Sequence, residues 1–303
     1  MKEKLKPLQK ILRPLLIIGV LVILVWRLND IGWESVLQEV PTSPLFYLIS
    51  PLIFFILPVN EVMTYRILLG RRVENGFAIF SRKRVLNDSV FTYSGEFYLL
   101  ARLRQIPDLH KDKDRLFRTI LDNNMISALV SNSVTILLVV SMLMIGRIDV
   151  IETVYDASPI AVSSFGAFCV VLYIVSIIFF RRSNHITGKT FWALFGLHTA
   201  RALAIMGLQM LQWSLGMPGE LFLTWLVFLT LQLLLSRLPL PNLELVFFAV
   251  AISLSGLADG SEAAVIAMFG AVTATSLVIQ LITFISTSFI KSEPATPQKV
   301  PAE

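Results

Sequence analysis

Residues 86–101 read LNDSVFTYSGEFYLLA and place a carboxylate in the middle of a short apolar segment. Arginine flanks this segment on both sides, at Arg84 and Arg102. An ionisable group inside the apolar part of a membrane protein is energetically costly and usually marks a functional site. Glu96, which directly follows Ser94-Gly95, is therefore the first candidate for such a site.

A second polar interruption, LPLPNLE at residues 238–244, opens another apolar run in the second half of the chain. Broken apolar segments at corresponding places in two halves of a transporter point to the substrate path. We therefore interpret Glu96 and Glu244 as a pair that lines a polar cavity and holds a cation or a cationic head group. A structural role is the alternative, because Ser94 and Asn242 are good N-cap residues and helix N-termini favour negative charge.

The composition is that of an integral membrane protein. Of the 303 residues, 55% are hydrophobic and only 16% are charged, whereas soluble domains average about 25% charged residues. The mean hydropathy is +0.73. The single cysteine, Cys169, excludes an intramolecular disulfide and a cysteine-based metal cluster. The basic residues lie in loops between apolar runs, so the pI of about 9.4 reflects membrane topology rather than a nucleic-acid partner.

The apolar runs predict an all-α polytopic membrane protein with about eight transmembrane helices and one re-entrant or broken-helix element. Runs long enough for the roughly 30 Å hydrocarbon core lie near residues 11–28, 44–65, 124–146, 158–180, 190–215, 219–238, 240–257 and 263–290. Residues 1–290 are predicted to form a single transmembrane domain. Residues 291–303 are predicted to be a disordered cytoplasmic tail.

The loop charges predict the orientation. Basic residues gather before the first run, after the second and before the third, while residues 27–43 and 147–157 are acidic. The positive-inside rule then places both termini in the cytoplasm of a cytoplasmic (inner) membrane. Residues 86–101 lie between two basic clusters that both belong inside, and the segment is too short to cross. We expect a re-entrant hairpin or half-helix that enters from the cytoplasmic face.

Polar side chains gather on one face of the helix predicted over residues 190–215, at His198, Arg201, Gln209 and Gln212. Arg201 lies near the middle of the span, where an exposed charge costs at least ~2.5 kcal/mol, so this stripe is expected to face other helices or a cavity. The planar donor fork of arginine suits a phosphate or anionic head group. An internal ion pair or amide network that fixes helix packing is the equally weighted alternative.

The third apolar run opens with Asp122-Asn123-Asn124. Small polar residues then follow on one helical face, and we interpret this face as a close helix-packing surface; its members are Asn124, Ser127, Ser131 and Thr135. Asp122 lies near the cytoplasmic interface and could pair with Arg118, one turn earlier.

Pro58 is expected to interrupt the helix predicted over residues 44–65. Glu61, just after this point, could line a cavity or extend toward the lipid head groups, and the second interpretation is slightly favoured. Trp33, Trp192 and Trp213 lie at or near the ends of apolar runs and are predicted to be interfacial residues.

Motifs for hydrolytic or redox chemistry are missing from the sequence, which has no HExxH, GxSxG or CxxC. Gly188-Lys189-Thr190 is similar to the end of a P-loop, but Ser183 occupies the position of its first glycine. The three histidines, His110, His185 and His198, are scattered. We therefore expect no catalytic residues, cofactor or metal.

Three segments together are similar to one known family: Tyr65–Leu69, Tyr93–Glu96 with Arg102 and Arg104, and Leu238–Glu244 followed by Gly256 and Ala263-Ala264. They resemble a flippase-like family that includes the transmembrane region of lysylphosphatidylglycerol synthases. The resemblance covers roughly residues 10 to 290. It implies a polytopic inner-membrane protein that moves an amphiphilic lipid between leaflets. The soluble aminoacyl-transfer domain of the synthases would need many more residues, so lipid aminoacylation by this chain alone is not expected.

The expected function is translocation of a phospholipid or lipid-linked glycan between the leaflets of the cytoplasmic membrane, through a polar cavity lined by the two broken helices. The cavity candidates are Glu96, Glu244, Arg201, Gln209, Gln212, His198, Glu61, Asp122 and Arg102. The expected partners are a membrane lipid or lipid-linked substrate, and not nucleic acid. Two alternatives are a membrane transferase that acts on lipid-linked substrates and a non-catalytic membrane partner of a lipid or glycan synthase.

Overall fold

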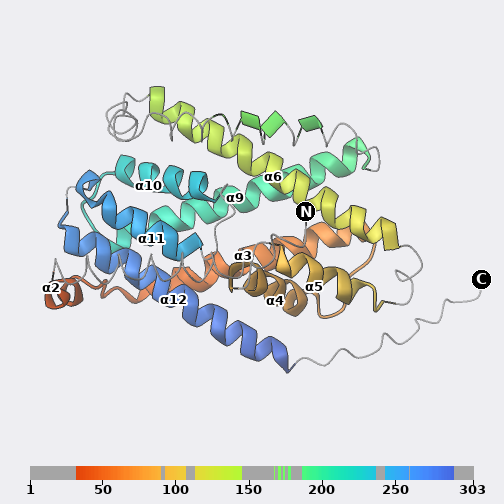
Figure 1. Ribbon diagram of the computed structural model, residues 1–303, viewed down its shortest axis with the longest axis horizontal. Coiled ribbons are helices and arrows are strands. Elements are labelled where there is room, and N and C mark those ends of the chain that lie inside the picture. The colour runs from red at the N-terminus through yellow and green to blue at the C-terminus, as the bar shows by residue number, and fades with distance from the viewer. Residues whose placement is uncertain are drawn as a thin grey trace, which may run out of the picture.

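The computed structural model describes residues 32–89, 93–106, 113–144, 186–236, 243–258 and 260–289, with a few isolated positions between 167 and 178. All regular structure in these ranges is helical (Figure 1). The elements are α2 (Trp33–Gln38), α3 (Pro44–Leu69), α4 (Gly76–Ser89), α5 (Ser94–Leu103), α6 (Lys113–Met144), α9 (Gly188–Gly216), α10 (Phe222–Leu235), α11 (Leu243–Ser253), the 3-10 helix η1 (Ser255–Leu257) and α12 (Glu262–Ser288).

Four of these helices, α3, α6, α9 and α12, are long and apolar enough to cross a membrane. The 26 residues of α3 extend over about 39 Å at 1.5 Å per residue, against a hydrocarbon core of roughly 30 Å. The chain is therefore an all-α, multi-pass membrane protein. The four helices overlap the spans predicted at 44–65, 124–146, 190–215 and 263–290, although α6 begins at Lys113, well before the predicted start at residue 124.

The other predicted spans have different outcomes. The run at 219–238 contains α10, which has only 14 residues. The run at 240–257 is divided between α11, with 11 residues, and η1. The predicted spans at 11–28 and 158–180 lie outside the described residues or almost wholly so, as does the predicted tail at 291–303. The count of eight crossings stays a prediction.

Residues 86–101, predicted to be a re-entrant hairpin or half-helix, are divided between two short helices, which fits a hairpin and not a single half-helix. Entry from the cytoplasmic face stays a prediction. α4 ends at Ser89 and α5 begins at Ser94, and the two helices pack against each other beside α3 (Figure 1). A similar pair, α10 and α11, precedes α12. Each half of the described chain thus runs long, short, short, long, with 26, 14, 10 and 32 residues in α3 to α6 and 29, 14, 11 and 27 in α9 to α12.

The first long helices of the two halves, α3 and α9, lie antiparallel. Near one end of their contact, the Asn60 side-chain amide donates to the Leu197 carbonyl over 2.9 Å. Near the other end, Gln212 Nε2 donates to the carbonyl of Phe46 over 2.9 Å and to Ser50 Oγ over 2.7 Å. Antiparallel first helices are what an inverted repeat requires, and inverted repeats with discontinuous helices are common in membrane transporters.

Aromatic side chains fill the centre of the second half. Trp213 of α9 packs edge-on against Phe269 of α12, with ring centroids 5.3 Å apart, and also contacts Phe247 and Trp225. The prediction that Trp213 lies at the membrane interface is wrong, because its side chain is 1% exposed. Trp33 and Trp192 are exposed, as residues at an interface would be.

α3 continues through Pro58 without the predicted interruption. Proline has no N–H, so the carbonyl four residues earlier, that of Phe54, loses its helical hydrogen bond. Arg84 of α4 supplies a replacement: its Nη1 donates to the carbonyl of Phe54, and to that of Ile53 over 3.2 Å. The guanidinium also lies over the Phe54 ring, 4.5 Å from its centroid. Arg84 therefore joins α4 to the turn of α3 that Pro58 deprives of a hydrogen bond.

This arrangement predicts energetic coupling between Arg84 and Pro58. Arg84→Ala leaves a buried carbonyl without a donor and should lower the free energy of unfolding by about 1–3 kcal/mol. Pro58→Ala restores the missing N–H, so the same Arg84→Ala change should cost clearly less in that background. Denaturant unfolding of the four variants in detergent micelles measures the coupling, with the exposed Arg72→Ala as control. Equal losses in the two backgrounds would contradict this role of Arg84.

Candidate functional site

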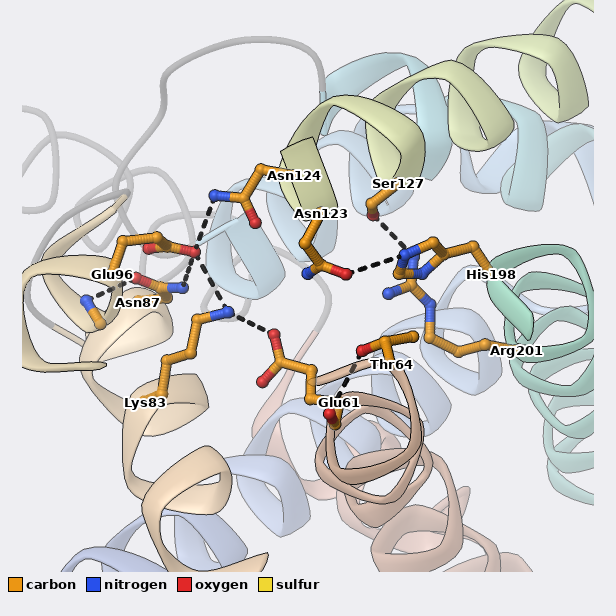
Figure 2. A network of polar contacts seen from close by, with 11 residues as sticks. Glu61, Thr64, Lys83, Asn87, Glu96, Asn123, Asn124, Ser127, His198 and Arg201 are labelled. Carbon is orange, nitrogen blue, oxygen red and sulfur yellow. Dashed lines mark hydrogen bonds and ion pairs between the residues drawn. The ribbon is translucent and has the colours of Figure 1, made fainter. Parts of the chain in front are cut away.

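A polar network lies where α3, α4, α5, α6 and α9 meet (Figure 2). α3 supplies Glu61, α4 supplies Lys83 and Asn87, and α5 supplies Glu96. α6 and α9 face them from the other side with asparagine, serine, histidine and arginine side chains. Three of these five helices are long apolar spans, so the network joins charged groups inside a mostly apolar bundle.

Lys83 is the centre of the network. Its ammonium forms an ion pair with Glu61 Oε1 and a second, at 3.3 Å, with Glu96 Oε1. The Lys83 and Glu61 residues are only 3% and 4% exposed. Charges this deeply buried are tolerated only when paired, because removing them from water costs several kcal/mol per ion. The ion pairs thus link α3, α4 and α5.

Contacts between α4 and the start of α5 fix the position of Glu96. The Gly95 N–H donates to Asn87 Oδ1 over 2.7 Å, and Asn87 Nδ2 donates to Glu96 Oε1 over 3.3 Å. Asn87, from the preceding helix, therefore caps the start of α5. The expectation that Ser94 is the N-cap is wrong: Tyr93 occupies that position with a φ of 74°, and the Ser94 hydroxyl donates to the Leu86 carbonyl.

Gly95 allows this close approach of α4 and α5. A Cβ atom at this position would overlap the backbone carbonyl of Lys83 and would lie 2.8 Å from Asn87 Oδ1. No side chain fits there without moving the two helices apart. The glycine before Glu96 is thus required by packing, and it places the carboxylate next to Lys83.

α6 and α9 complete the network. Asn124 Nδ2 donates to Glu96 Oε1 over 3.5 Å, the longest hydrogen bond of the group. Arg201 Nη2 donates to Ser127 Oγ over 3.0 Å, and His198 Nε2 lies 3.2 Å from Asn123 Oδ1. The interpretation of the α6 face as a pure packing surface therefore misses these polar contacts of its N-terminal half.

Several hydrogen-bonding atoms of the network have no partner among the described residues. They are Glu61 Oε2, Glu96 Oε2, Asn60 Oδ1 and His198 Nδ1. Asn123 Oδ1 can only accept, so His198 Nε2 carries the hydrogen and Nδ1 of the neutral ring is an acceptor. All four atoms are thus acceptors, and they can receive hydrogen bonds from an ammonium group, a hydroxyl group or water.

Arg201 offers the opposite chemistry. Its guanidinium has five N–H donors, of which one hydrogen bond, to Ser127, is formed within the described part of the chain. No carboxylate among the described residues forms an ion pair with Arg201, although the charges of Glu61 and Arg201 attract each other. The site thus combines unused acceptors with unused donors, the combination needed for a zwitterionic or phosphate-bearing group.

The remaining sequence candidates lie elsewhere. Gln209 and Gln212 extend the stripe of α9 but contact α10 and α3 rather than the network. Asp122 is buried on α6, at 7% exposure. Arg102 lies on another face of α5, where it contacts Gln105 and the Tyr98 ring. α11 begins at Leu243, and the Glu244 side chain lies outside what the structure describes.

Sequence reasoning missed Lys83, Asn87 and Asn123. Lys83 belongs to the basic run Arg82-Lys83-Arg84, and this run has the pattern of a cytoplasmic loop in the sequence. The available signal was helical spacing, because Lys83 and Asn87 are four residues apart and share a face that precedes Gly95-Glu96.

No protein-family model matches the chain, and neither a curated protein nor a solved structure matches it. What the site can bind is therefore inferred from the positions and hydrogen-bonding groups of its own residues.

Gly95→Ala should destabilise the fold, since overpacking of a tight contact costs typically 1–3 kcal/mol. Gly207→Ala is the matched control, because Gly207 is exposed on α9 with no atom within 4 Å of its added Cβ. That change should be neutral or stabilising by up to about 1 kcal/mol. Unfolding in detergent measures both variants, and similar values for the two would contradict the packing requirement at Gly95.

Lys83→Met should lower the free energy of unfolding by about 3–5 kcal/mol, because it leaves two carboxylates buried without a cation. Neutralising them in the triple variant Lys83→Met, Glu61→Gln, Glu96→Gln should recover most of this loss. Denaturant titration in micelles provides the comparison, and the exposed Lys189→Met is the control. A triple variant less stable than Lys83→Met would show that the ion pairs do not hold the helices together.

Proposed function

We propose that this chain moves a phospholipid or lipid-linked glycan between the leaflets of the cytoplasmic membrane. The observation that carries the proposal is the buried network of Glu61, Lys83, Glu96, His198 and Arg201 between long apolar helices. Ionisable groups at such places are expensive and usually belong to a substrate or ion pathway.

The chemistry of the network suits an amphiphilic lipid. The free donors of Arg201 match the oxygens of a phosphate, for which guanidinium is well shaped. The free carboxylate oxygens of Glu61 and Glu96 match the N–H or O–H donors of a head group. The acyl chains would stay in the surrounding bilayer while the polar head group crosses between the helices.

The proposed topology has both termini in the cytoplasm, because the basic loops favour that orientation. The count of eight crossings requires α10 and α11 each to cross with their flanking residues. The 14 residues of α10 extend over only about 21 Å. If α10 and α11 instead enter and leave the membrane on the same side, the number of crossings falls from eight to six. Because six is also an even number, both termini stay on the same side of the membrane.

Glu244 is the proposed counterpart of Glu96. It follows Leu243, the first residue of α11, as Glu96 lies in the first turn of α5. Each short helix pair then carries one carboxylate near the start of its second helix, one in each half of the chain.

Leaflet-resolved transport in proteoliposomes tests the proposal. Fluorescent phosphatidylglycerol and phosphatidylethanolamine are incorporated, and a membrane-impermeant quencher reports the fraction that reaches the outer leaflet. Glu96→Gln, Glu61→Gln and Arg201→Ala should each slow transport at least about tenfold, the effect of losing one charge-assisted interaction of 1.4 kcal/mol or more.

The matched controls are Glu39→Gln and Arg72→Ala, which change exposed side chains of the same types. They should transport at the wild-type rate. Wild-type rates in all three network variants would refute the proposed site, and no lipid movement by the wild-type protein with any lipid tested would refute the translocase function.

The alternatives, a membrane transferase or a non-catalytic partner of a lipid or glycan synthase, make different predictions. Product formation by the purified chain would indicate a transferase. Co-purification with a fixed synthase, whose activity falls when this chain is removed, would indicate a partner.

A further inference from the structure

A cavity of about 60 Å³ lies between α3 and the helices of the second half, α9 to α12. Its polar lining includes Ser50, Arg84, Gln209, Gln212 and Gln232, and aromatic rings including that of Trp213 form much of the rest. A buried water needs about 10–15 Å³ of such space, so the cavity has room for a few waters or one small polar group.

The cavity lies at a place in the second half of the chain that corresponds to the place of the charged network in the first half. The network joins the four helices of the first half, α3 to α6, with α9 from the second half. The cavity joins the four helices of the second half, α9 to α12, with α3 from the first half, and with Arg84 from α4. The two halves thus hold corresponding sites with different chemistry, ionic in the first half and mainly amide in the second.

The hydrogen bonds around the cavity leave donors free. Gln209 Nε2 donates to Gln232 Oε1 over 2.9 Å, which leaves the Gln232 amide donors unused. Arg84 uses Nη1 for the α3 carbonyls and Nε for Asp88, so its Nη2 has no partner within the described ranges. Gln212 is 1% exposed and is held by Phe46 and Ser50.

Among the described residues the lining contains no carboxylate, and Arg84 is the charged side chain that it includes. One guanidinium and amide donors favour an oxygen-rich anion over a cation. The volume suits a single phosphate group better than a sugar ring. The ligand chemistry that fits is therefore a phosphate ester.

The cavity and the charged network also lie along the same pair of helices, α3 and α9. On α9, Arg201 and Gln209 are eight residues apart, and on α3 Glu61 and Ile53 are eight residues apart, about 12 Å in each case. Both pairs point to two sites along the same α3–α9 contact rather than one large site.

We propose that the cavity is a second site for the phosphate group of the transported lipid, reached after or before the charged network during transport. This inference rests on the proposed translocation of a lipid. The first site holds the head group beside Arg201, and the second holds its phosphate beside Arg84, Gln209 and Gln232.

The test measures binding by the full chain in micelles in an Arg201→Ala background, so that the network contributes little to phosphate binding. The ligands are dihexanoylphosphatidylglycerol, dihexanoylglycerol, which lacks the phosphate, and inorganic phosphate. The phospholipid should bind more tightly than the diacylglycerol. Adding Gln209→Leu with Gln232→Leu should weaken phospholipid binding about tenfold and leave diacylglycerol binding unchanged.

The paired substitution is chosen so that the protein still folds, because replacing both partners of a buried hydrogen bond by apolar groups of similar shape is nearly neutral. Gln105→Leu, at an exposed position just after α5, is the matched control and should bind like its parent. Equal binding of the two dihexanoyl lipids, or an equal loss for both in the Gln variant, would overturn the phosphate site. Binding of inorganic phosphate as tight as that of the phospholipid would overturn its assignment to a lipid.

The transport assay separates this inference from the proposed function. Transport is therefore measured with Gln209→Leu and Gln232→Leu introduced into the wild-type chain. If Arg201→Ala stops transport while this pair changes neither transport in the wild-type chain nor phospholipid binding in the Arg201→Ala background, the second site is wrong and the translocase stands. If the Gln variant loses phospholipid binding but the wild-type protein moves no lipid, the cavity is a phospholipid site and the translocase function is wrong.

Discussion

The ion pairs of Lys83 with Glu61 and Glu96 are the constraint on which the rest of the first half depends. Lys83 and Glu61 are buried among apolar helices, and the Glu96 side chain is 15% exposed. Each charge requires the others because an isolated buried charge costs several kcal/mol. The two short helices α4 and α5 can pack beside α3 only in the arrangement that keeps these groups together. Gly95 and Asn87 then set the spacing of α4 and α5 to match.

Each residue of the basic run Arg82-Lys83-Arg84 on α4 contacts another helix. Arg82 donates to the Thr287 carbonyl of α12 over 3.3 Å and lies over the rings of Tyr98 and Phe284. Lys83 joins the carboxylates, and Arg84 satisfies the carbonyls left free by Pro58. Three consecutive cations thus connect α4 to three different neighbours, so α4 contacts α3, α5 and α12.

The sequence predicts the membrane class and the long helices well, because runs of apolar residues of that length have few other stable environments. It also identifies Glu96 and Arg201 as unusual, since each is an ionisable group in an apolar segment. It does not predict their partners. A buried lysine between two arginines has the same local sequence pattern as a lysine in a cytoplasmic loop. Only the contact of Lys83 with Glu61, 22 residues earlier, distinguishes the buried lysine from a loop lysine. Trp213 was misplaced for the same reason: nearness to the end of a run does not reveal whether a neighbouring helix covers the ring.

The contrast between the two halves has a mechanical consequence. Separating the ion-paired helices α3, α4 and α5 exposes charges to an apolar environment at a cost of several kcal/mol. Breaking the Gln209–Gln232 hydrogen bond between α9 and α10 costs about 1 kcal/mol. The second half is held mainly by its aromatic core, in which Trp213 contacts Trp225, Phe247 and Phe269. α10 and α11 can therefore shift by repacking rings without leaving a charge unpaired, whereas α3, α4 and α5 can separate only if each of their charges finds a new partner.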